Sequence, residues 1–283
     1  MKARFGPAGN SESFAAQGYK SSLDVPAYLT GMGLNAFEYQ CGRGVNIGLE
    51  KAKQLGEAAK AADIALSLHA PYYISMSGEK EETRLKSVDY ILQSAAAVKA
   101  MGGNRIIVHT GSCGKMTRQA ALALAEDTMR KAIAALDANG FSDIHICPET
   151  MGKINQLGDL QEVLALCRLD ERLIPCIDFG HLNARTLGGF KSRADFEAVF
   201  DAIESALGID RLRRYHAHFS KIEYTTGGEK RHLTFEDTLF GPNFEPVIEL
   251  TVQKNCAPTI ICESAGTQAE DARTMKKYYE SLV

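Results

Sequence analysis

Short apolar runs of this chain end repeatedly in histidine or in an acidic residue, the side-chain types that bind zinc and related metal ions. The runs Leu-Ser-Leu-His69 and Ile-Ile-Val-His109 show the pattern. Its other members are Glu149, Asp178, His216 and Glu263. Apolar runs of this length are typical of buried strands, so each polar residue would stand at or near a strand end. The pattern predicts a polar ring at one end of a sheet.

These apolar runs alternate with longer segments of helical periodicity. Their richness in Ile, Val and Leu favours parallel strands that are covered on both faces. The predicted strands are residues 3–5, 36–39, 65–69, 105–109, 144–149, 174–178, 214–219 and 258–263, and the clearest predicted helices are residues 48–62, 82–101, 117–139, 192–207 and 267–282. Eight βα units in succession favour a (β/α)8 TIM barrel over an open sheet. No linker or low-complexity stretch divides residues 1–283, so one domain is expected.

Composition narrows the class of protein further. The chain has 283 residues, 45% of them hydrophobic, and a formal net charge of -3, so it has no global cationic field to attract nucleic acid. DNA binding would therefore depend on a local patch or on bound metal ions. The start of the chain lacks an apolar signal segment, and no apolar run approaches membrane-spanning length. Seven cysteines without a C-x-x-C pair are expected as core thiols of a cytoplasmic protein.

The barrel turns the sequence pattern into a spatial prediction, because catalytic residues of this fold gather at the carboxyl ends of the strands. A single histidine or glutamate at one strand end is usually explained by a hydrogen bond or an ion pair. Six candidates at consecutive strand ends instead predict joint metal binding. They suffice for two ions that share a bridging carboxylate, which together activate a water and clamp a phosphate.

Several short motifs then resemble, in order and spacing, those of the endonuclease IV family of xylose-isomerase-like TIM barrels. The resemblance runs from about residue 30 to the end of the chain. The motifs are Ser67-Leu-His69-Ala-Pro-Tyr72, His109-Thr-Gly111, Glu149-Thr150, Asp178-Phe-Gly-His181, His216-x-x-x-Ser220-Lys221, Arg231-His232 and Glu263-Ser264.

The resemblance implies a zinc enzyme that hydrolyses the backbone of double-stranded DNA on the 5′ side of abasic sites. Three Zn²⁺ ions would be bound, with Mn²⁺ or Fe²⁺ as alternatives, and the family suggests a monomer. A hydroxide that bridges two of the ions would be the nucleophile, and Glu149 and Glu263 are the expected catalytic residues. The implied ligands are His69 and His109 for the first ion, Glu149 as a bridge to a second ion held by Asp178, His216 and Glu263, and His181 and His232 for the third.

The sequence departs from the family at the motif for the third ion. The family has Asp-Arg-His where this chain has Lys230-Arg231-His232. A protonated lysine cannot bind a cation, and Glu229, one residue earlier, would replace the aspartate only if the loop shifted. Lys230 itself is a candidate for stabilising phosphate charge. In the seventh strand, His218 shares a face with His216, and direct metal binding, substrate contact and a hydrogen bond to a metal ligand all remain open for it.

Predictions about the substrate depend on fewer signals. Arg43 and Tyr72 occupy loops from which the family inserts side chains into bent DNA, although Tyr72 is equally suited to lining a small-molecule pocket. Lys221, Lys230 and Arg231 are candidates for phosphate contacts. Two other functions remain open. One is a sugar isomerase or epimerase on the same barrel, with one divalent ion, and the other is a barrel that binds damaged nucleic acid without cutting it.

Overall fold

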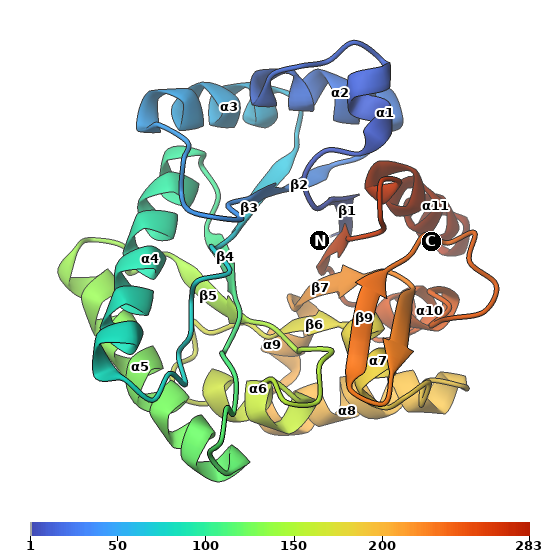
Figure 1. Cartoon of the computed structure of the whole chain (residues 1–283). Helices are drawn as coiled ribbons and strands as arrows, with labels where there is room; N and C mark the ends of the chain where they lie inside the picture. Colours follow the sequence, from blue (N-terminus) through green and yellow to red (C-terminus); the bar gives the residue numbers. More distant parts are fainter. Residues whose placement is uncertain (1) are drawn as a thin grey trace.

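A computed structural model describes residues 2–283 of the chain, and its centre is a ring of eight parallel strands (Figure 1). Their bounds are Arg4–Pro7 (β1), Ala36–Gln40 (β2), Ala65–His69 (β3), Arg105–Val108 (β4), His145–Pro148 (β5), Cys176–Asp178 (β6), His216–Phe219 (β7) and Thr259–Cys262 (β10). Each predicted strand overlaps one of these strands.

The strands close into a barrel. Four of them pair in the order β1-β10-β7-β6, and the other four in the order β2-β3-β4-β5. Two parallel bridges join the halves, from Ala8 to Glu38 and from Glu149 to Cys176. The first connects β1 with β2, and the second connects the end of β5 with β6. The predicted TIM-barrel fold is therefore confirmed.

Helices surround the barrel on its outer side (Figure 1). They are α1 (Glu12–Ala16), α2 (Val25–Met32), α3 (Leu49–Ala61), α4 (Glu81–Ala100), α5 (Arg118–Ala138), α6 (Leu160–Cys167), α7 (Phe179–Arg185), α8 (Arg193–Leu207), α9 (Ile209–Arg213), α10 (Glu245–Gln253) and α11 (Gln268–Leu282), with a 3-10 turn at Ser22–Asp24. The five predicted helices agree with α3, α4, α5, α8 and α11 to within two residues at each end. The start of α5 is fixed by Thr117, whose hydroxyl accepts a hydrogen bond from the backbone N–H of Ala120.

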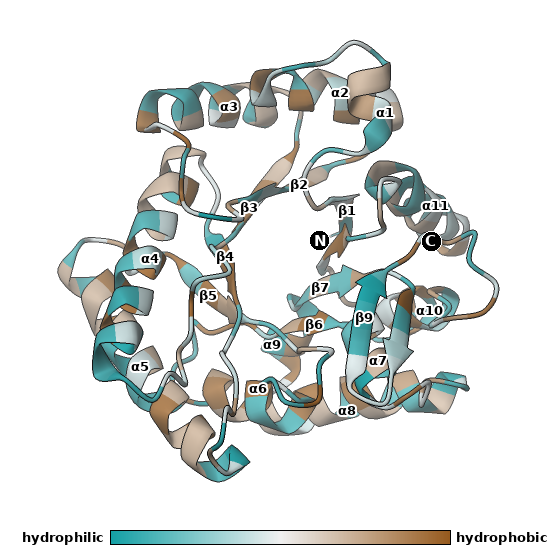
Figure 2. Ribbon diagram, in the orientation of Figure 1, coloured by the Kyte–Doolittle hydropathy of each residue, from teal (hydrophilic) through white to brown (hydrophobic). Residues whose placement is uncertain are grey.

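A β-hairpin interrupts the alternation of strands and helices after β7. Its strands are β8 (Ile222–Thr225) and β9 (Gly228–His232), which pair antiparallel. Figure 2 shows that β9 is mostly hydrophilic, in contrast to the apolar strands β4 and β5. The register shifts between Glu223 and Tyr224, since these residues face Arg231 and Glu229 and leave Lys230 as an extra residue in β9.

The apolar core fills the space between the strands and the helices. The outward side chains of β7 illustrate it, because Phe219 is buried and its ring lies 6.4 Å from that of Phe179. All seven cysteines are buried free thiols, as expected. Within residues 2–283, no helix combines the length and the apolar character that a membrane span requires.

Candidate metal centre

The carboxyl ends of the strands surround a hollow of about 560 Å³, and predicted metal ligands line its wall. Figure 1 looks into this end of the barrel. The lining includes His69, His109, Glu149, His181, His232 and Glu263, together with Glu229, Lys153, Gln40 and Tyr72. The structure thus brings together residues that lie almost 200 positions apart in the sequence, from His69 to Glu263.

A first group of potential ligands consists of His69, His109 and Glu149. His69 is the last residue of β3, and the other two directly follow β4 and β5. The Nε2 atoms of His69 and His109 lie 3.3 Å and 3.2 Å from Oε2 of Glu149. Nδ1 of His69 lies 2.9 Å from the carbonyl oxygen of Ala70, to which it donates a hydrogen bond. The unprotonated Nε2 of a neutral His69 therefore faces a carboxylate oxygen, an arrangement that requires a shared cation or proton.

A second group contains Glu149, Asp178, His218 and Glu263. Nδ1 of His218 lies 3.2 Å from Oε1 of Glu149 and 3.6 Å from Oε1 of Glu263. Oδ1 of Asp178 accepts a hydrogen bond from the backbone N–H of His181, which lies in the first turn of helix α7. Oδ2 of Asp178 is buried without a hydrogen-bond partner among residues 2–283, although Nδ1 of His181 lies 3.4 Å from it. An orphaned carboxylate oxygen among other carboxylates is costly unless a cation is bound, so these residues fit a metal ion.

The second group differs from the prediction in its histidine, because the structure brings His218, and not His216, to Glu149 and Glu263. The pairing of β6 with β7 explains the difference. His218 is level with Asp178 at the end of β6, whereas His216 is level with Cys176, two residues deeper in the barrel. Two residues of strand correspond to roughly 6.6 Å, too far for His216 to reach the same ion.

A third group lies beside the hairpin and contains His181, His232 and Glu263. Glu229 lies beside it, since its two carboxylate oxygens lie 3.5 Å from Nε2 of His181 and 3.9 Å from Nε2 of His232. The Nδ1 atoms of the two histidines are occupied by Thr150 O at 2.9 Å and by Ser220 Oγ at 2.8 Å. Both Nε2 atoms are thereby turned toward Glu229, so this group also has the donor set of a metal site.

The extra residue in β9 brings Glu229 next to His181 and His232. Successive side chains of a regular strand point to opposite faces, so Glu229 and His232 would point apart. The bulge at Lys230 reverses the alternation and puts both on the side of His181. Lys230 points away from His181 and pairs with Glu223 at 2.6 Å.

Shared residues connect the three groups. Glu149 belongs to the first and second groups, and Glu263 belongs to the second and third. Within each group, Glu229 not included, the ligand atoms lie within 4.8 Å of one another. The arrangement can therefore hold up to three neighbouring cations without any rearrangement of the barrel strands.

The charges of the site are strongly coupled. Burial acts to raise the pKa of Glu149, but attraction to His218 and hydrogen bonds with His109, His181 and His218 outweigh it and hold that pKa well below its ordinary value. Burial raises the pKa of Asp178 to about 6. For His181 and His218, burial acts to lower the pKa, but the surrounding negative charges raise it well above the ordinary value. The carboxylates thus attract positive charge, either as protons on the imidazoles or as metal ions.

The predicted substrate-binding residues lie in different surroundings. Tyr72 is 58% exposed and stands over the first group, with its ring 5.5 Å from that of His69 and 5.4 Å from that of His109. Arg43 lies in the loop after β2. The ammonium group of Lys221 donates to the carbonyls of Phe235 and Asp237, so this lysine braces a loop.

The two cations of the hairpin, Lys230 and Arg231, are exposed and both pair with Glu223. They lie outside the wall of the hollow. Lys153 and Gln40 belong to that wall, but the sequence did not predict them as site residues. Neither lies in a motif, and only the closure of the barrel brings them to the site.

Comparison with known proteins gives the family. The Xylose isomerase-like TIM barrel family matches residues 26–281, and the chain belongs to this family. Uncharacterized protein MJ0133 of Methanocaldococcus jannaschii is 31% identical over 276 residues, which are 98% of this chain and 97% of that protein. Probable endonuclease 4 of Staphylococcus carnosus is 28% identical over 164 residues, 55% of this chain and 52% of that protein. The resemblance to endonuclease IV is confirmed at the level of the family.

Solved structures agree on the fold. Endonuclease IV from Thermus thermophilus superposes with a TM-score of 0.68 at 18% identity, covering 98% of this chain and 99% of that one. The 3-keto-D-glucoside 4-epimerase YcjR from E. coli superposes with a TM-score of 0.67 at 15% identity, covering 99% of this chain and all of that one. Nuclease and epimerase thus match equally well, so the reaction must be inferred from the site.

Proposed function

We propose that the protein is a metal-dependent endonuclease that hydrolyses the DNA backbone on the 5′ side of abasic sites. The observation that carries the proposal is the chain of three ligand groups linked by Glu149 and Glu263. Phosphodiester hydrolysis benefits from several neighbouring cations, because charge develops on both the attacking and the leaving oxygen. Relatives described as probable endonuclease 4 support the same reaction class.

Each group would hold one divalent ion, most simply Zn²⁺, because imidazole and carboxylate are among its usual ligands. Bound ions would supply an activated water near neutral pH and positive charge for the phosphate. Glu149 would hold the ions of the first two groups, and Glu263 those of the second and third. Asp178 fixes the start of α7 through Oδ1 and leaves Oδ2 for an ion.

Substrate recognition would depend on the rim of the hollow. Tyr72 is exposed above His69 and His109, where its ring can stack on a base or fill the gap of a missing base. Arg43 on the neighbouring loop would contact the displaced strand. With a net charge of -3, the protein gains little from long-range attraction to DNA, so local contacts and bound ions would supply the affinity.

A sugar epimerase is the second candidate, and one observation favours it. The group of Glu149, Asp178, His218 and Glu263 can by itself bind one ion between two glutamates. Two carboxylates that flank a carbonyl sugar are suited to moving a proton from one face of a carbon to the other. This alternative leaves His69, His109, His181 and His232 without a role, which is why the nuclease is preferred.

The decisive experiment uses a DNA duplex with one tetrahydrofuran abasic analogue, which resists cleavage by lyases. The metal-loaded protein should nick it on the 5′ side, and elemental analysis should give at least two ions per chain. A single ion, with epimerisation of a ketose and an intact duplex, would establish the epimerase. Binding of the duplex without a nick would indicate a non-cutting barrel.

Two variants test the assignment of the ligands. His109→Ala removes a ligand of the first group, and Glu263→Ala removes the residue shared by the second and third groups. Each should reduce nicking by at least roughly 100-fold while the circular dichroism spectrum stays that of a folded barrel. Glu171→Ala, on the exposed loop after α6, is the matched control and should nick at the wild-type rate. Full activity in both ligand variants would refute the assignment.

A further inference from the structure

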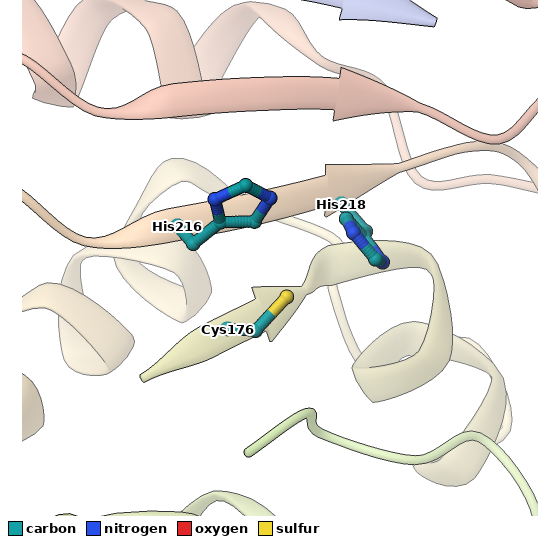
Figure 3. A group of neighbouring side chains, drawn as sticks. All are labelled: Cys176, His216 and His218. Carbon is teal, nitrogen blue, oxygen red and sulfur yellow. The ribbon is translucent and has the colours of Figure 1, made fainter. Parts of the chain in front are cut away.

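A second set of metal-binding side chains lies inside the barrel, beneath the hollow. It consists of Cys176 on β6 and of His216 and His218 on β7, and all three are fully buried. Figure 3 shows that the Cys176 sulfur points toward the space between the two imidazole rings. The three ligand atoms lie within 4.8 Å of one another. Such a polar layer is unusual, because the interior of this fold is normally filled by branched apolar side chains.

A fully buried carboxylate, that of Glu38, lies beside both imidazoles. Glu38 on β2 places Oε2 3.0 Å from Nε2 of His216 and Oε1 2.8 Å from Nε2 of His218. The contact with His216 is a hydrogen bond. The contact with His218 is shorter but poorly aligned for a hydrogen bond. A close, poorly aligned contact between an imidazole nitrogen and a carboxylate oxygen is the arrangement expected where both face the same cation.

His218 therefore has two separate faces. Its Nδ1 lies 3.2 Å from Glu149 at the floor of the hollow, whereas its Nε2 faces Glu38 and the interior of the barrel. One imidazole can bind two ions through its two nitrogens once both protons have left it. Cys176 and His216 are level with each other on paired strands, so the interior side of His218 lies above two further donors.

We propose that Cys176, His216 and Nε2 of His218 form an additional, interior metal site for a zinc-type divalent ion, beside which the carboxylate of Glu38 supplies a second negative charge. One thiolate and two imidazoles are ligands of the kind that bind structural zinc. Binding displaces the protons of the thiol and of the imidazole nitrogens into solvent, and the negative charges of Cys176 and Glu38 balance the ion. The site does not depend on the reaction proposed for the hollow.

The rival explanation is a hydrogen-bonded interior without metal. It accounts for the contact between His216 and Glu38, but it leaves the 2.8 Å contact of Nε2 of His218 with Glu38 poorly aligned for a hydrogen bond. Cys147 offers an internal comparison, because it is as buried as Cys176 and packs against the same apolar cluster. Its thiol donates to the carbonyl of His145 in its own strand, and it belongs to none of the ligand groups among the described residues.

Cobalt tests the proposal, because a cobalt ion bound by a thiolate absorbs in the near ultraviolet, whereas one bound only by imidazole and carboxylate does not. The three groups of the hollow contain no cysteine among the described residues. Titration of the metal-free protein with Co²⁺ should therefore produce this charge-transfer band from the interior site alone. Cys176→Ser should abolish the band and reduce bound Co²⁺ by one ion per chain, whereas Cys147→Ser should keep both.

The wild-type protein provides the test even if a variant folds poorly. Bound Co²⁺ without a thiolate band would overturn the interior site, and so would a band that survives in Cys176→Ser or disappears in Cys147→Ser. A band together with an intact abasic duplex would refute the nuclease and leave the interior site established. Nicking without the thiolate band would refute the interior site and support the nuclease.

Discussion

At the level of single residues, the third ligand group depends on Glu229, whose carboxylate lies between His181 and His232. Removal of this carboxylate should weaken binding of one ion and lower the nicking rate roughly 100-fold, the usual effect of losing one stabilising charge at a reacting phosphate. Glu229→Ala is therefore expected to contain one zinc fewer per chain than the wild type. Elemental analysis and a nicking assay measure the two effects.

The neighbouring lysine is the control for this prediction. Lys230 is exposed and pairs with Glu223 on the outer side of the hairpin. Lys230→Ala should keep the wild-type zinc content and change the nicking rate by no more than about twofold, since an exposed ion pair contributes little energy. Loss of an ion in Lys230→Ala, with no loss in Glu229→Ala, would contradict the assignment of Glu229 to the third ligand group.

At the level of elements, the hairpin is held against the loop that follows β5 by a close approach of two backbones. The N–H of Glu229 donates to the carbonyl of Gly152 at 3.1 Å. A Cβ atom on Gly152 would lie 2.6 Å from Cβ of Glu229 and 2.9 Å from Cδ2 of His181. Gly152 therefore lets the hairpin carry Glu229 to His181.

Gly152→Ala should push the hairpin outward and separate these two ligands. We expect loss of one zinc ion and a decrease of about 1–3 kcal/mol in the free energy of unfolding, the usual cost of inserting a methyl group into a packed contact. Gly227→Ala in the turn of the same hairpin is the control, because its Cβ would meet only the Thr225 hydroxyl at 3.7 Å. Zinc analysis and urea unfolding of both variants test the idea, and equal zinc contents would disprove it.

The start of α6 provides a prediction about pH. Glu162 accepts hydrogen bonds from the backbone N–H groups of Gly158 and Asp159 and from Arg118. Burial acts to raise the pKa of Glu162, but these donors outweigh it and lower the pKa. A lowered pKa means that the ionised form stabilises the fold above the unfolded-state pKa of about 4.3, and that this stabilisation is lost as the pH falls through the folded-state pKa.

Glu162→Gln should therefore reduce the free energy of unfolding by about 1–3 kcal/mol near neutral pH, the range for hydrogen bonds to a charged group. The difference from the wild type should shrink as the pH falls below about 4. Urea unfolding at a series of pH values measures it, with Glu171→Gln on an exposed loop as control. A difference that stays constant with pH would mean that the charge of Glu162 plays no part.

The elements also show which parts of the site could be predicted from the sequence. His69, His109, Glu149 and Glu263 end or follow apolar runs, and barrel topology alone was enough to bring them together. The choice between His216 and His218 required the register of β7 against β6, which no local pattern records. The position of Glu229 required the bulge at Lys230. Both depend on pairing between strands, and a sequence motif describes only one strand.

At the level of the whole molecule, the ligands come from strands all around the barrel, so bound ions would tie most of the sheet together. The ends of β3, β4, β5, β6 and β10 each supply a ligand, as does β7 through His218. Because an ion binds this arrangement only when the barrel is closed, metal binding should stabilise the entire fold. At a free zinc concentration a thousand times the dissociation constant, one site contributes about 4 kcal/mol.

Asp178→Asn separates two effects of Asp178 on the stability of the barrel: the cost of its buried charge and its contribution to metal binding. The change preserves Oδ1, which accepts the N–H of His181 at the start of α7, and places a neutral amide where the buried Oδ2 has no partner. The metal-free variant should be more stable than the metal-free wild type by about 1–3 kcal/mol, since a buried charge that has no hydrogen bond on Oδ2 and only His181 at 3.4 Å beside it has been replaced by a neutral group. Zinc should stabilise the variant less than the wild type, because a neutral amide is a poorer ligand than a carboxylate. Thermal unfolding with chelator and with zinc measures both effects, and a metal-free variant less stable than the wild type would show that Oδ2 is satisfied without an ion.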